Sequence, residues 1–297
     1  MRFVTLDSTS GPRIGAVVGD HVVDLNAVDP RLPTGLGAFL RGGGLLDDLT
    51  AKAMAAKGAH ARGLATITHG LPVSDPGKIF CLGLNYLEHV REGNNQVVDY
   101  PTIFMRGLSS LVAHHKPIIR PLISDKLDFE AELVVLIGKR IRHATPQTAL
   151  AAVAGYSCFN DGSVRDYQRR TTQWTVGKNF DQTGGFGPWL VTADELPPGA
   201  SGLKIESRLN GKVMQSDNTT NMMFPVAETI VTITQAITLE PGDMLVMGTP
   251  SGVGYARKPP IYMKHGDVCE IEIEAVGVLS NPIADEVLGD IASQPSN

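Results

Sequence analysis

The chain has 297 residues, of which 42% are hydrophobic and 19% charged, and its 26 basic and 31 acidic side chains leave a formal net charge of −5. This composition is typical of a folded globular protein and unlike that of a disordered chain. An acidic chain without a cluster of basic residues is a poor binder of nucleic acid, and no apolar run approaches the roughly 20 residues that a membrane-spanning helix needs.

The first 70 residues predict a small N-terminal domain. We expect short strands and one helix in it, at residues 2–6, 13–18, 21–25 and 47–68. Gly19–Asp20 lies between two of these strands and predicts a hairpin turn. The run LPVSDPGK at 71–78 is rich in turn-forming residues and marks the best boundary. We therefore predict a small domain at 1–72 and the main catalytic domain at 73–297.

The main domain is expected to be strand-rich with few helices, an α+β fold, because the chain has 32 glycines and 19 prolines that favour many turns. Its predicted strands are 79–82, 103–106, 128–138, 203–209, 244–247 and 267–276, and its predicted helices are 145–153 and 226–237. The polar stretch between Asn85 and Tyr100 is expected to begin with one or two helical turns and to continue as a loop.

The segment KLDFEAELVVLIGK at 126–139 carries alternating acidic residues that run into an apolar strand. Side chains alternate between the two faces of a strand, so Asp128, Glu130 and Glu132 are expected on one face. Carboxylates that share a partly buried face repel one another unless a cation lies among them, and hard divalent ions prefer such oxygens. The alternative is an exposed, solvated strand end.

A second acidic position is Asp161, which ends an apolar run and precedes an arginine-rich segment. Taken alone it fits a turn or a helix cap. Arg165 and Gln168 follow four and seven positions later, on the same helical face as Asp161. A guanidinium and an amide on one face suit the binding of a substrate carboxylate.

Two further patterns suggest catalytic groups. His89 and Glu92 are three positions apart on a predicted helical turn, where a carboxylate fixes the imidazole tautomer and raises its basicity as a general base. Lys178 precedes a glycine-rich loop and could neutralise developing negative charge. Each pattern also fits ordinary solvated side chains.

Other patterns point away from common sites. The three cysteines are scattered and form no CxxC pair, which favours reduced thiols and, with no apparent secretory leader, a cytoplasmic protein. MGTPSGVG at 247–254 is neither a phosphate loop nor a nucleophile elbow, although Thr249 could offer its hydroxyl to a carboxylate. Neighbouring strand residues face opposite ways, so His114 and His115 are expected to be structural and not joint metal ligands.

Together and in this order, the segments resemble the fumarylacetoacetate hydrolase family. The matching residues are Gly83–Leu84–Asn85–Tyr86 with His89 and Glu92, Asp128–Phe129–Glu130–Ala131–Glu132–Leu133, Asn160–Asp161 with Arg165–Asp166, Gln173–Trp174–Thr175 with Gly177–Lys178, Gly187–Pro188–Trp189 and Gly248–Thr249–Pro250. Residues 14–25 also look like the small N-terminal domain of that family. The resemblance implies a β-roll of stacked sheets and a homodimer.

The resemblance also implies roles for individual residues. It implies Mg²⁺ or Mn²⁺ bound by Glu130, Glu132 and Asp161, a base dyad of His89 and Glu92 on a lid, Lys178 beside the metal, and substrate contacts from Tyr86, Arg165, Gln168 and Thr249. The loop at 182–185 departs from the family pattern, so the resemblance does not fix the substrate.

The expected activity is hydrolysis of a C–C bond in an acylpyruvate or another 1,3-diketo acid, in the catabolism of aromatic compounds, through a metal-stabilised enolate and a water activated by the His–Glu dyad. The same site would also serve an oxaloacetate-type decarboxylase or a hydroxymuconate-type isomerase or decarboxylase. A non-catalytic binder of keto acids is the alternative from another class. A two-carboxylate glycosidase is disfavoured, because Glu130 and Glu132 are strand neighbours and cannot flank a sugar ring.

Overall fold

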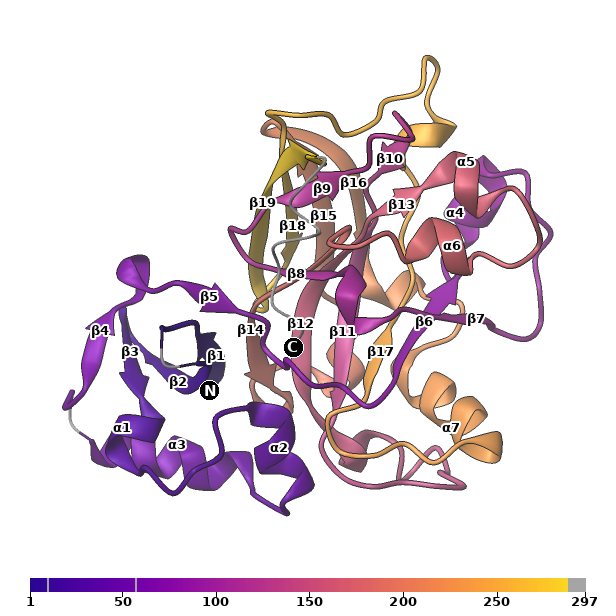
Figure 1. Cartoon of the computed structure of the whole chain (residues 1–297). Helices are drawn as coiled ribbons and strands as arrows, with labels where there is room; N and C mark the ends of the chain where they lie inside the picture. Colours follow the sequence, from indigo (N-terminus) through magenta and orange to yellow (C-terminus); the bar gives the residue numbers. More distant parts are fainter. Residues whose placement is uncertain (10, 57, 288–297) are drawn as a thin grey trace.

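The computed structural model describes residues 1–9, 11–56 and 58–287. Its main feature is a large mixed sheet that passes from the N-terminal lobe into the body of the molecule (Figure 1). The strands in spatial order are β4 (Ala61–Gly63), β3 (His21–Asp24), β2 (Arg13–Val18), β1 (Arg2–Leu6), β14 (Gly184–Thr192), β12 (Val153–Asp161), β11 (Ala131–Ile137), β17 (Met244–Val246), β6 (Ile79–Gly83) and β7 (Thr102–Met105), with β5 (His69–Gly70) on β1 and β8 (Leu111–Ala113) on β14.

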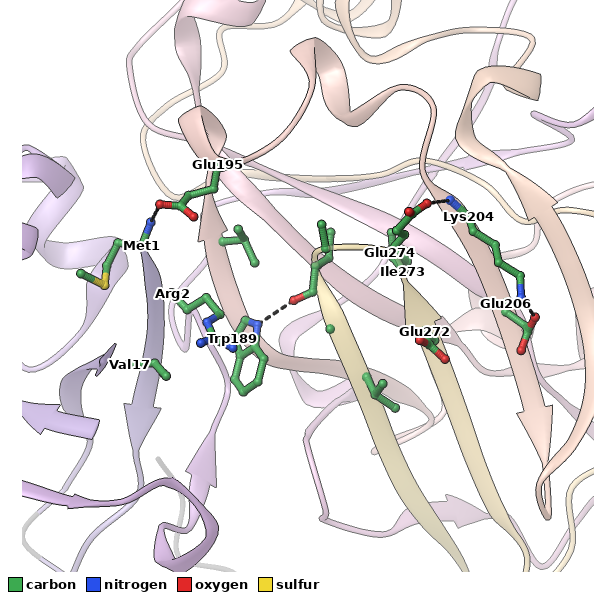
Figure 2. A pocket seen from close by; sticks show the side chains of 15 residues that line it. Met1, Arg2, Val17, Trp189, Glu195, Lys204, Glu206, Glu272, Ile273 and Glu274 are labelled. Atoms are coloured by element: carbon green, nitrogen blue, oxygen red, sulfur yellow. Dashed lines mark hydrogen bonds and ion pairs between the residues drawn. The ribbon is translucent and has the colours of Figure 1, made fainter. Parts of the chain in front are cut away.

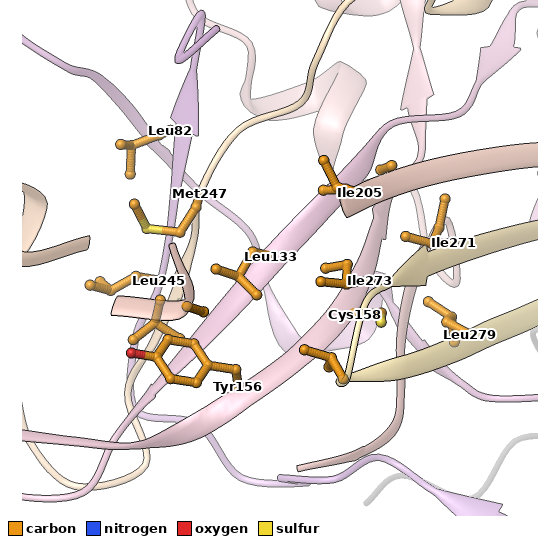
Figure 3. Close-up of a cluster of buried hydrophobic side chains, with 14 of the residues drawn as sticks. Leu82, Leu133, Tyr156, Cys158, Ile205, Leu245, Met247, Ile271, Ile273 and Leu279 are labelled. Carbon is orange, nitrogen blue, oxygen red and sulfur yellow. The ribbon is translucent and has the colours of Figure 1, made fainter. Parts of the chain in front are cut away.

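A second sheet and a short ribbon complete the strands. The second sheet has the order β16 (Lys212–Asn218), β15 (Lys204–Leu209), β18 (Val268–Ile273), β19 (Gly277–Asp285) and β9 (Ile118–Arg120), and the ribbon pairs β10 (Leu127–Asp128) with β13 (Ser163–Val164). Side chains from both sheets meet in one buried cluster, in which Leu133 and Cys158 of the large sheet lie near Ile205 and Ile273 of the second (Figure 3). The stacked-sheet architecture expected from the sequence is confirmed.

Helices are short and lie around the sheets (Figure 1). They are α1 (Leu25–Val28), α2 (Leu36–Arg41), α3 (Leu46–Ala55), α4 (Leu87–Glu92), α5 (Arg165–Gln168), α6 (Thr175–Lys178) and α7 (Val226–Ala236), with 3₁₀ turns at Leu64–Thr66, Leu108–Ser110, Leu150–Ala152, Ala193–Glu195, Pro198–Ala200, Thr219–Asn221 and Gly254–Ala256. Across the described ranges, none of these helices has the length and apolar character needed to cross a membrane.

Strand β11 lies inside the large sheet between β12 and β17, and every one of its residues is buried. Leu133 and Val135 belong to the cluster between the two sheets, whereas Val134 and Leu136 belong to the cluster on the other side. A strand covered on both faces needs apolar residues at every position and not at alternate ones. This explains the continuous apolar run that follows Glu132.

Three of the predicted elements are wrong in extent or type. The predicted helix at 145–153 is a set of turns that ends in the 3₁₀ turn Leu150–Ala152, and Val153 already belongs to β12. The helix predicted at 47–68 ends at Ala55, and the chain turns back into β4 near Gly58, which has a φ of +82°. Residue 57 of that range lies outside the described residues.

The third correction concerns the predicted strand 128–138. The structure divides it into β10 and β11, with Phe129–Glu130 between them. The predicted boundary near residue 72 stays a prediction, and residues 288–297 of the predicted main domain lie outside the described part of the chain. The N-terminal lobe is joined to the rest by backbone pairing, since Arg2 and Phe3 of β1 pair with Val191 and Leu190 of β14.

Candidate metal centre and active site

Three buried carboxylates meet where β11 and β12 lie side by side. Ligand atoms of Glu130, Glu132 and Asp161 all lie within 4.8 Å of one another. The strands are antiparallel with Ala131 opposite Asn160, and the backbone N–H of Asp161 donates to the carbonyl oxygen of Glu130. The register of these two strands therefore brings together residues that are some thirty positions apart in the sequence.

Asp128 does not join this group, contrary to the expectation that it shares a face with the two glutamates. The strand is interrupted between β10 and β11, and the Asp128 side chain turns away from the two glutamates. Its carboxylate accepts the backbone N–H groups of Gly254 and Tyr255 and the Nε–H of Arg165. Asp128 thus fixes the loop that carries Tyr255 and orients Arg165.

Buried cations compensate most of this negative charge. The Nζ atom of Lys178 lies 2.5 Å from Oε2 of Glu130 and 2.6 Å from Oδ2 of Asp161. Arg165 places one guanidinium nitrogen 2.7 Å from Oε1 of Glu130. Arg106, which directly follows β7, forms an ion pair with the other carboxylate oxygen of Asp161.

Arg106 is a site residue that the sequence did not reveal. It is 3% exposed, and besides Asp161 it donates to the hydroxyls of Ser110 and Thr183 and to the carbonyl oxygen of Gly162. The one signal in the sequence is an arginine immediately after an apolar strand, a position that a surface arginine fills equally well. Apart from Ser110, its partners Asp161, Gly162 and Thr183 come from distant segments, and only the fold brings them together.

The two glutamates differ in electrostatic environment. Burial opposes the ionisation of Glu130, but the charges of Arg165 and Lys178 outweigh it and hold the pKa of this carboxyl below its ordinary value. Burial raises the pKa of the Glu132 carboxyl well above its ordinary value, and the charges of Asp161 and Glu130 raise it further. Among the described residues, no cationic side chain forms an ion pair with Glu132.

The donor set fits a hard divalent cation. Four buried carboxylates, including Asp128, are matched by three buried cations, so one negative charge is left without a partner. Carboxylate oxygens are the ligands that Mg²⁺ and Mn²⁺ prefer, and a doubly charged ion beside Glu132 would remove the cost of ionising it. In the described ranges, this is the single group of three or more acidic, histidine or cysteine side chains that is close enough to share an ion.

Helix α4 brings a histidine–glutamate pair to the same place. Nδ1 of His89 lies 2.8 Å from Oε1 of Glu92, and the second carboxylate oxygen of Glu92 accepts the backbone N–H of Gly252 at 2.8 Å. A proton on Nδ1 satisfies the bond to Glu92 and leaves Nε2 as a proton acceptor. His89 is buried, with 5% of its surface exposed.

The glycine-rich loop at 247–254 closes the site from the other side. The backbone N–H of Gly248 donates to Oε2 of Glu132 at 2.6 Å. Gly248 has a φ of +84°, and a Cβ atom there would lie 2.6 Å from Cβ of Asn85. Glycine is therefore required both by the backbone conformation and by the close approach of the chain.

These groups surround a cavity of about 130 Å³. It is lined by Leu82, Gly83, Leu84, His89, Asn95, Phe104, Glu130, Glu132, Arg165, Gln168, Arg169, Trp174, Lys178, Thr249 and Tyr255. Of the predicted substrate contacts, Arg165, Gln168 and Thr249 line it. Tyr86 does not: it is 1% exposed, and its hydroxyl has no hydrogen-bond partner among the described residues.

Arg165 and Thr249 also hold their neighbours in place. The guanidinium of Arg165 is bound to Asp128, Glu130 and the amide oxygen of Gln168. The hydroxyl of Thr249 accepts the amide N–H of Gln215 at 2.7 Å. Arg165 thus forms hydrogen bonds through Nε and Nη1, whereas Nη2 pairs with Glu130 by charge and has no hydrogen-bond partner among the described residues.

Larger hollows lie elsewhere. One of about 850 Å³ is found where the N-terminal lobe meets the two sheets, beside Trp189 and the Met1 amino group, which pairs with Glu195 (Figure 2). None of the predicted catalytic or metal-binding residues lines it. The small cavity is therefore the candidate active site, because the convergent titratable groups lie there.

The paired histidines differ from the expectation that they face opposite ways. The rings of His114 and His115 lie 3.7 Å apart between centroids, and the ring of His69 lies 4.7 Å from that of His114. His115 has a φ of +64°, which turns the chain out of the extended conformation and brings both rings to one side. The three rings form a cluster between β5 and β8.

Comparison with known proteins places this site in a family context. The family model "Fumarylacetoacetate (FAA) hydrolase C-terminal" matches residues 78–284. The mitochondrial oxaloacetate tautomerase Fahd2a of Rattus norvegicus is 40% identical over 275 residues, covering 92% of this chain and 87% of the relative.

Two solved structures show the same fold. The fumarylacetoacetate hydrolase of Exiguobacterium antarcticum has a TM-score of 0.83 at 32% identity and covers 96% of this chain and 100% of its own. The maleylpyruvate hydrolase of Sphingobium sp. SYK-6, in complex with manganese(II) and pyruvate, has a TM-score of 0.80 at 28% identity and covers 97% of this chain and 100% of its own.

Proposed function

The chain belongs to the fumarylacetoacetate hydrolase family of enzymes, and we propose that it moves a proton at the carbon beside the keto group of a small 2-oxo acid, with oxaloacetate as the first candidate substrate. The observation that carries this proposal is that His89, which is bonded to Glu92, lines the same small cavity as Glu130 and Glu132 of the carboxylate trio. The rat relative that is named an oxaloacetate tautomerase supports the choice of substrate.

Glu130, Glu132 and Asp161 would hold Mg²⁺ or Mn²⁺, which supplies a Lewis acid for the charge of an enolate when it is bound. Lys178 supports the same charge, because burial opposes its protonation but Asp161 and Glu130 outweigh burial and raise the pKa of its ammonium. The lysine therefore remains a cation at neutral pH and acts as an electrostatic group and not as a base.

His89 is the base in this proposal. For conversion of the keto form to the enol form, the C–H bond beside the keto group breaks, Nε2 of His89 takes the proton, and the keto oxygen gains a proton from the imidazolium or solvent. Substrate and product are isomers, so no water is consumed. Glu92 holds the imidazole in the tautomer that this step requires.

The C–C bond hydrolysis expected from the sequence is the second candidate. The same dyad would take a proton from water, the hydroxide would add to the distal carbonyl of an acylpyruvate, and the bond to the enolate would break to give a carboxylic acid and pyruvate. The Sphingobium relative, a maleylpyruvate hydrolase seen with pyruvate, favours this candidate. Decarboxylation of oxaloacetate, which needs no attacking water, uses the same enolate.

A substrate panel separates these reactions. The protein is loaded with Mg²⁺ or Mn²⁺ and mixed with oxaloacetate, acetylpyruvate, maleylpyruvate and fumarylpyruvate, while enol absorbance is recorded and products are identified by mass. We expect faster equilibration of the enol and keto forms of oxaloacetate without loss of mass. Release of pyruvate from an acylpyruvate would support the second candidate, and no turnover of any substrate with either metal would contradict both.

Three further expectations from the sequence remain proposals. These are a homodimer, a cytoplasmic location and a role in the catabolism of aromatic compounds. Light scattering of the purified protein tests the first of them directly.

A further inference from the structure

Arg169 is the unpaired cation of the active-site cavity. Four cationic or potentially cationic side chains line this cavity. Arg165, Lys178 and His89 are each held by one or more carboxylates. Arg169 lines the same cavity and forms no ion pair or side-chain hydrogen bond with any residue in the described part of the chain.

The position of Arg169 is fixed all the same. Its guanidinium carbon lies 4.1 Å from the centroid of the Tyr255 ring, and that of Arg165 lies 4.4 Å from the same centroid. The single turn of α5 produces this arrangement, because Arg165 and Arg169 are four residues apart. The backbone N–H of Tyr255 is in turn bound to Asp128. A guanidinium stacked on a fixed ring is ordered before any ligand arrives.

We propose that Arg169 binds the distal carboxylate of the substrate and makes the site select 2-oxo dicarboxylic acids over 2-oxo acids with an uncharged tail. This inference rests on the proposed function for the other end of the substrate, the 2-oxo acid group, which would bind the divalent ion that Glu130, Glu132 and Asp161 would hold. Arg169 and Arg165 both contact the ring of Tyr255, and Arg165 contacts Glu130, so the two ends of the site are close enough for a short acid.

The cavity and its charges agree with this assignment. A volume of about 130 Å³ is well below the roughly 300–1,000 Å³ of sites for drug-sized ligands, which favours a short acid. Arg165 was the carboxylate-binding residue expected from the sequence, but its charge is already matched by ion pairs with Asp128 and Glu130, although its Nη2 has no hydrogen-bond partner among the described residues. A free guanidinium beside it is the better partner for an added carboxylate.

The chain offers a matched control in the next residue. Arg170 is also exposed and also stacks on a tyrosine, with its guanidinium carbon 3.8 Å from the centroid of Tyr167, but it does not line the cavity. The variants Arg169→Met and Arg170→Met each remove one exposed positive charge and keep the aliphatic stem. They differ only in whether the lost charge faces the cavity.

Two inert ligands isolate the distal carboxylate. Malate and lactate share a 2-hydroxy carboxylate that can bind a metal, and only malate has a second carboxylate. With Mg²⁺ present, calorimetry on the wild-type protein is expected to show roughly tenfold or more tighter binding of malate than of lactate. Arg169→Met should remove this preference and Arg170→Met should keep it. Equal binding of both ligands by the wild type, or an unchanged preference in Arg169→Met, would overturn the inference.

Kinetics separate this inference from the proposed function. If oxaloacetate is the substrate, Arg169→Met should raise its KM about tenfold with little change in kcat, and should leave the KM of acetylpyruvate unchanged. If the wild type is active and Arg169→Met has the same KM for oxaloacetate, the role of Arg169 is overturned and the proposed reaction is not. If the wild type turns over no substrate of the panel but still binds malate more tightly than lactate in an Arg169-dependent way, the proposed reaction is overturned and the role of Arg169 is not.

Discussion

His89 and Glu92 lie three positions apart on α4, with Nδ1 of the histidine 2.8 Å from Oε1 of the glutamate. The other oxygen of Glu92 accepts the backbone N–H of Gly252, so one carboxylate both orients the base and attaches α4 to the glycine-rich loop. Docking of this helix and orientation of the imidazole therefore occur together.

Replacement of His89 by alanine should lower kcat by roughly 10²–10⁴-fold, because a positioned general base contributes about that much. Metal affinity should change little, since His89 contacts none of the three carboxylates in the trio by a hydrogen bond or ion pair within the described structure. Steady-state rates with the preferred substrate measure the change in kcat, and a Mn²⁺ titration of the same variant measures the metal affinity. Full activity in His89→Ala would remove the dyad from the mechanism.

Glu130→Gln and Glu132→Gln should change the stability of the metal-free protein in opposite directions. Glu130 neutralises Arg165 and Lys178, so its replacement leaves buried cations partly unpaired and should cost roughly 3 kcal/mol. The pKa of Glu132 is raised in the folded state, so its ionisation opposes folding at neutral pH, and a neutral amide should raise Tm.

Both glutamine variants should bind Mg²⁺ and Mn²⁺ more weakly, because each loses an anionic ligand. Thermal unfolding with and without each metal measures both effects in one experiment. A metal-free Glu132→Gln protein that is less stable than the wild type would show that the charge of this residue is already compensated.

The sequence predicts those parts of the site that depend on neighbouring residues of one segment better than those that depend on contacts between segments. The alternating acids and the apolar run after Glu132 predict a buried strand beside carboxylates, because both periodicity and burial are local properties. Asp128 follows the same alternation and still lies apart from the trio, since two residues between β10 and β11 leave the strand conformation. No local signal distinguishes such an interruption from a continuous strand.

Features that depend on partners from several segments escape sequence analysis. The role of Arg106 is defined by its contacts with Ser110, Asp161 and Thr183, which belong to three separate parts of the fold. The positive φ of His115 is imposed by the turn between β8 and β9 and overrides the alternation expected for neighbouring residues.

Arg106→Met should destabilise the metal-free protein by roughly 3 kcal/mol, because it removes one of the two ion-pair partners of the buried Asp161 and leaves two hydroxyls without their donor. The double variant Arg106→Met/Asp161→Asn should recover part of this loss, since the neutral amide no longer needs a cation. Urea unfolding of the wild type, both single variants and the double variant gives the coupling energy. Additive effects would mean that the pair contributes nothing to the fold.

The histidine cluster should make stability depend on pH. Burial lowers the pKa of His114 to about 3, with the neighbouring charges of His115 and His69 acting in the same direction. The unfolded state takes up a proton near pH 6.5, so this histidine favours the folded state above that pH, and the advantage is lost as the pH falls from about 6.5 towards 3.

The replacement His114→Asn tests this effect, because its side-chain oxygen can accept the Ser280 backbone N–H that Nδ1 of His114 now accepts. At pH 7.5 the two proteins should have similar Tm values apart from a constant packing loss. Between pH 6.5 and 5 the wild type should lose stability more steeply, by at most about 1.4 kcal/mol per pH unit. Parallel curves of Tm against pH for the two proteins would show that His114 does not titrate on unfolding.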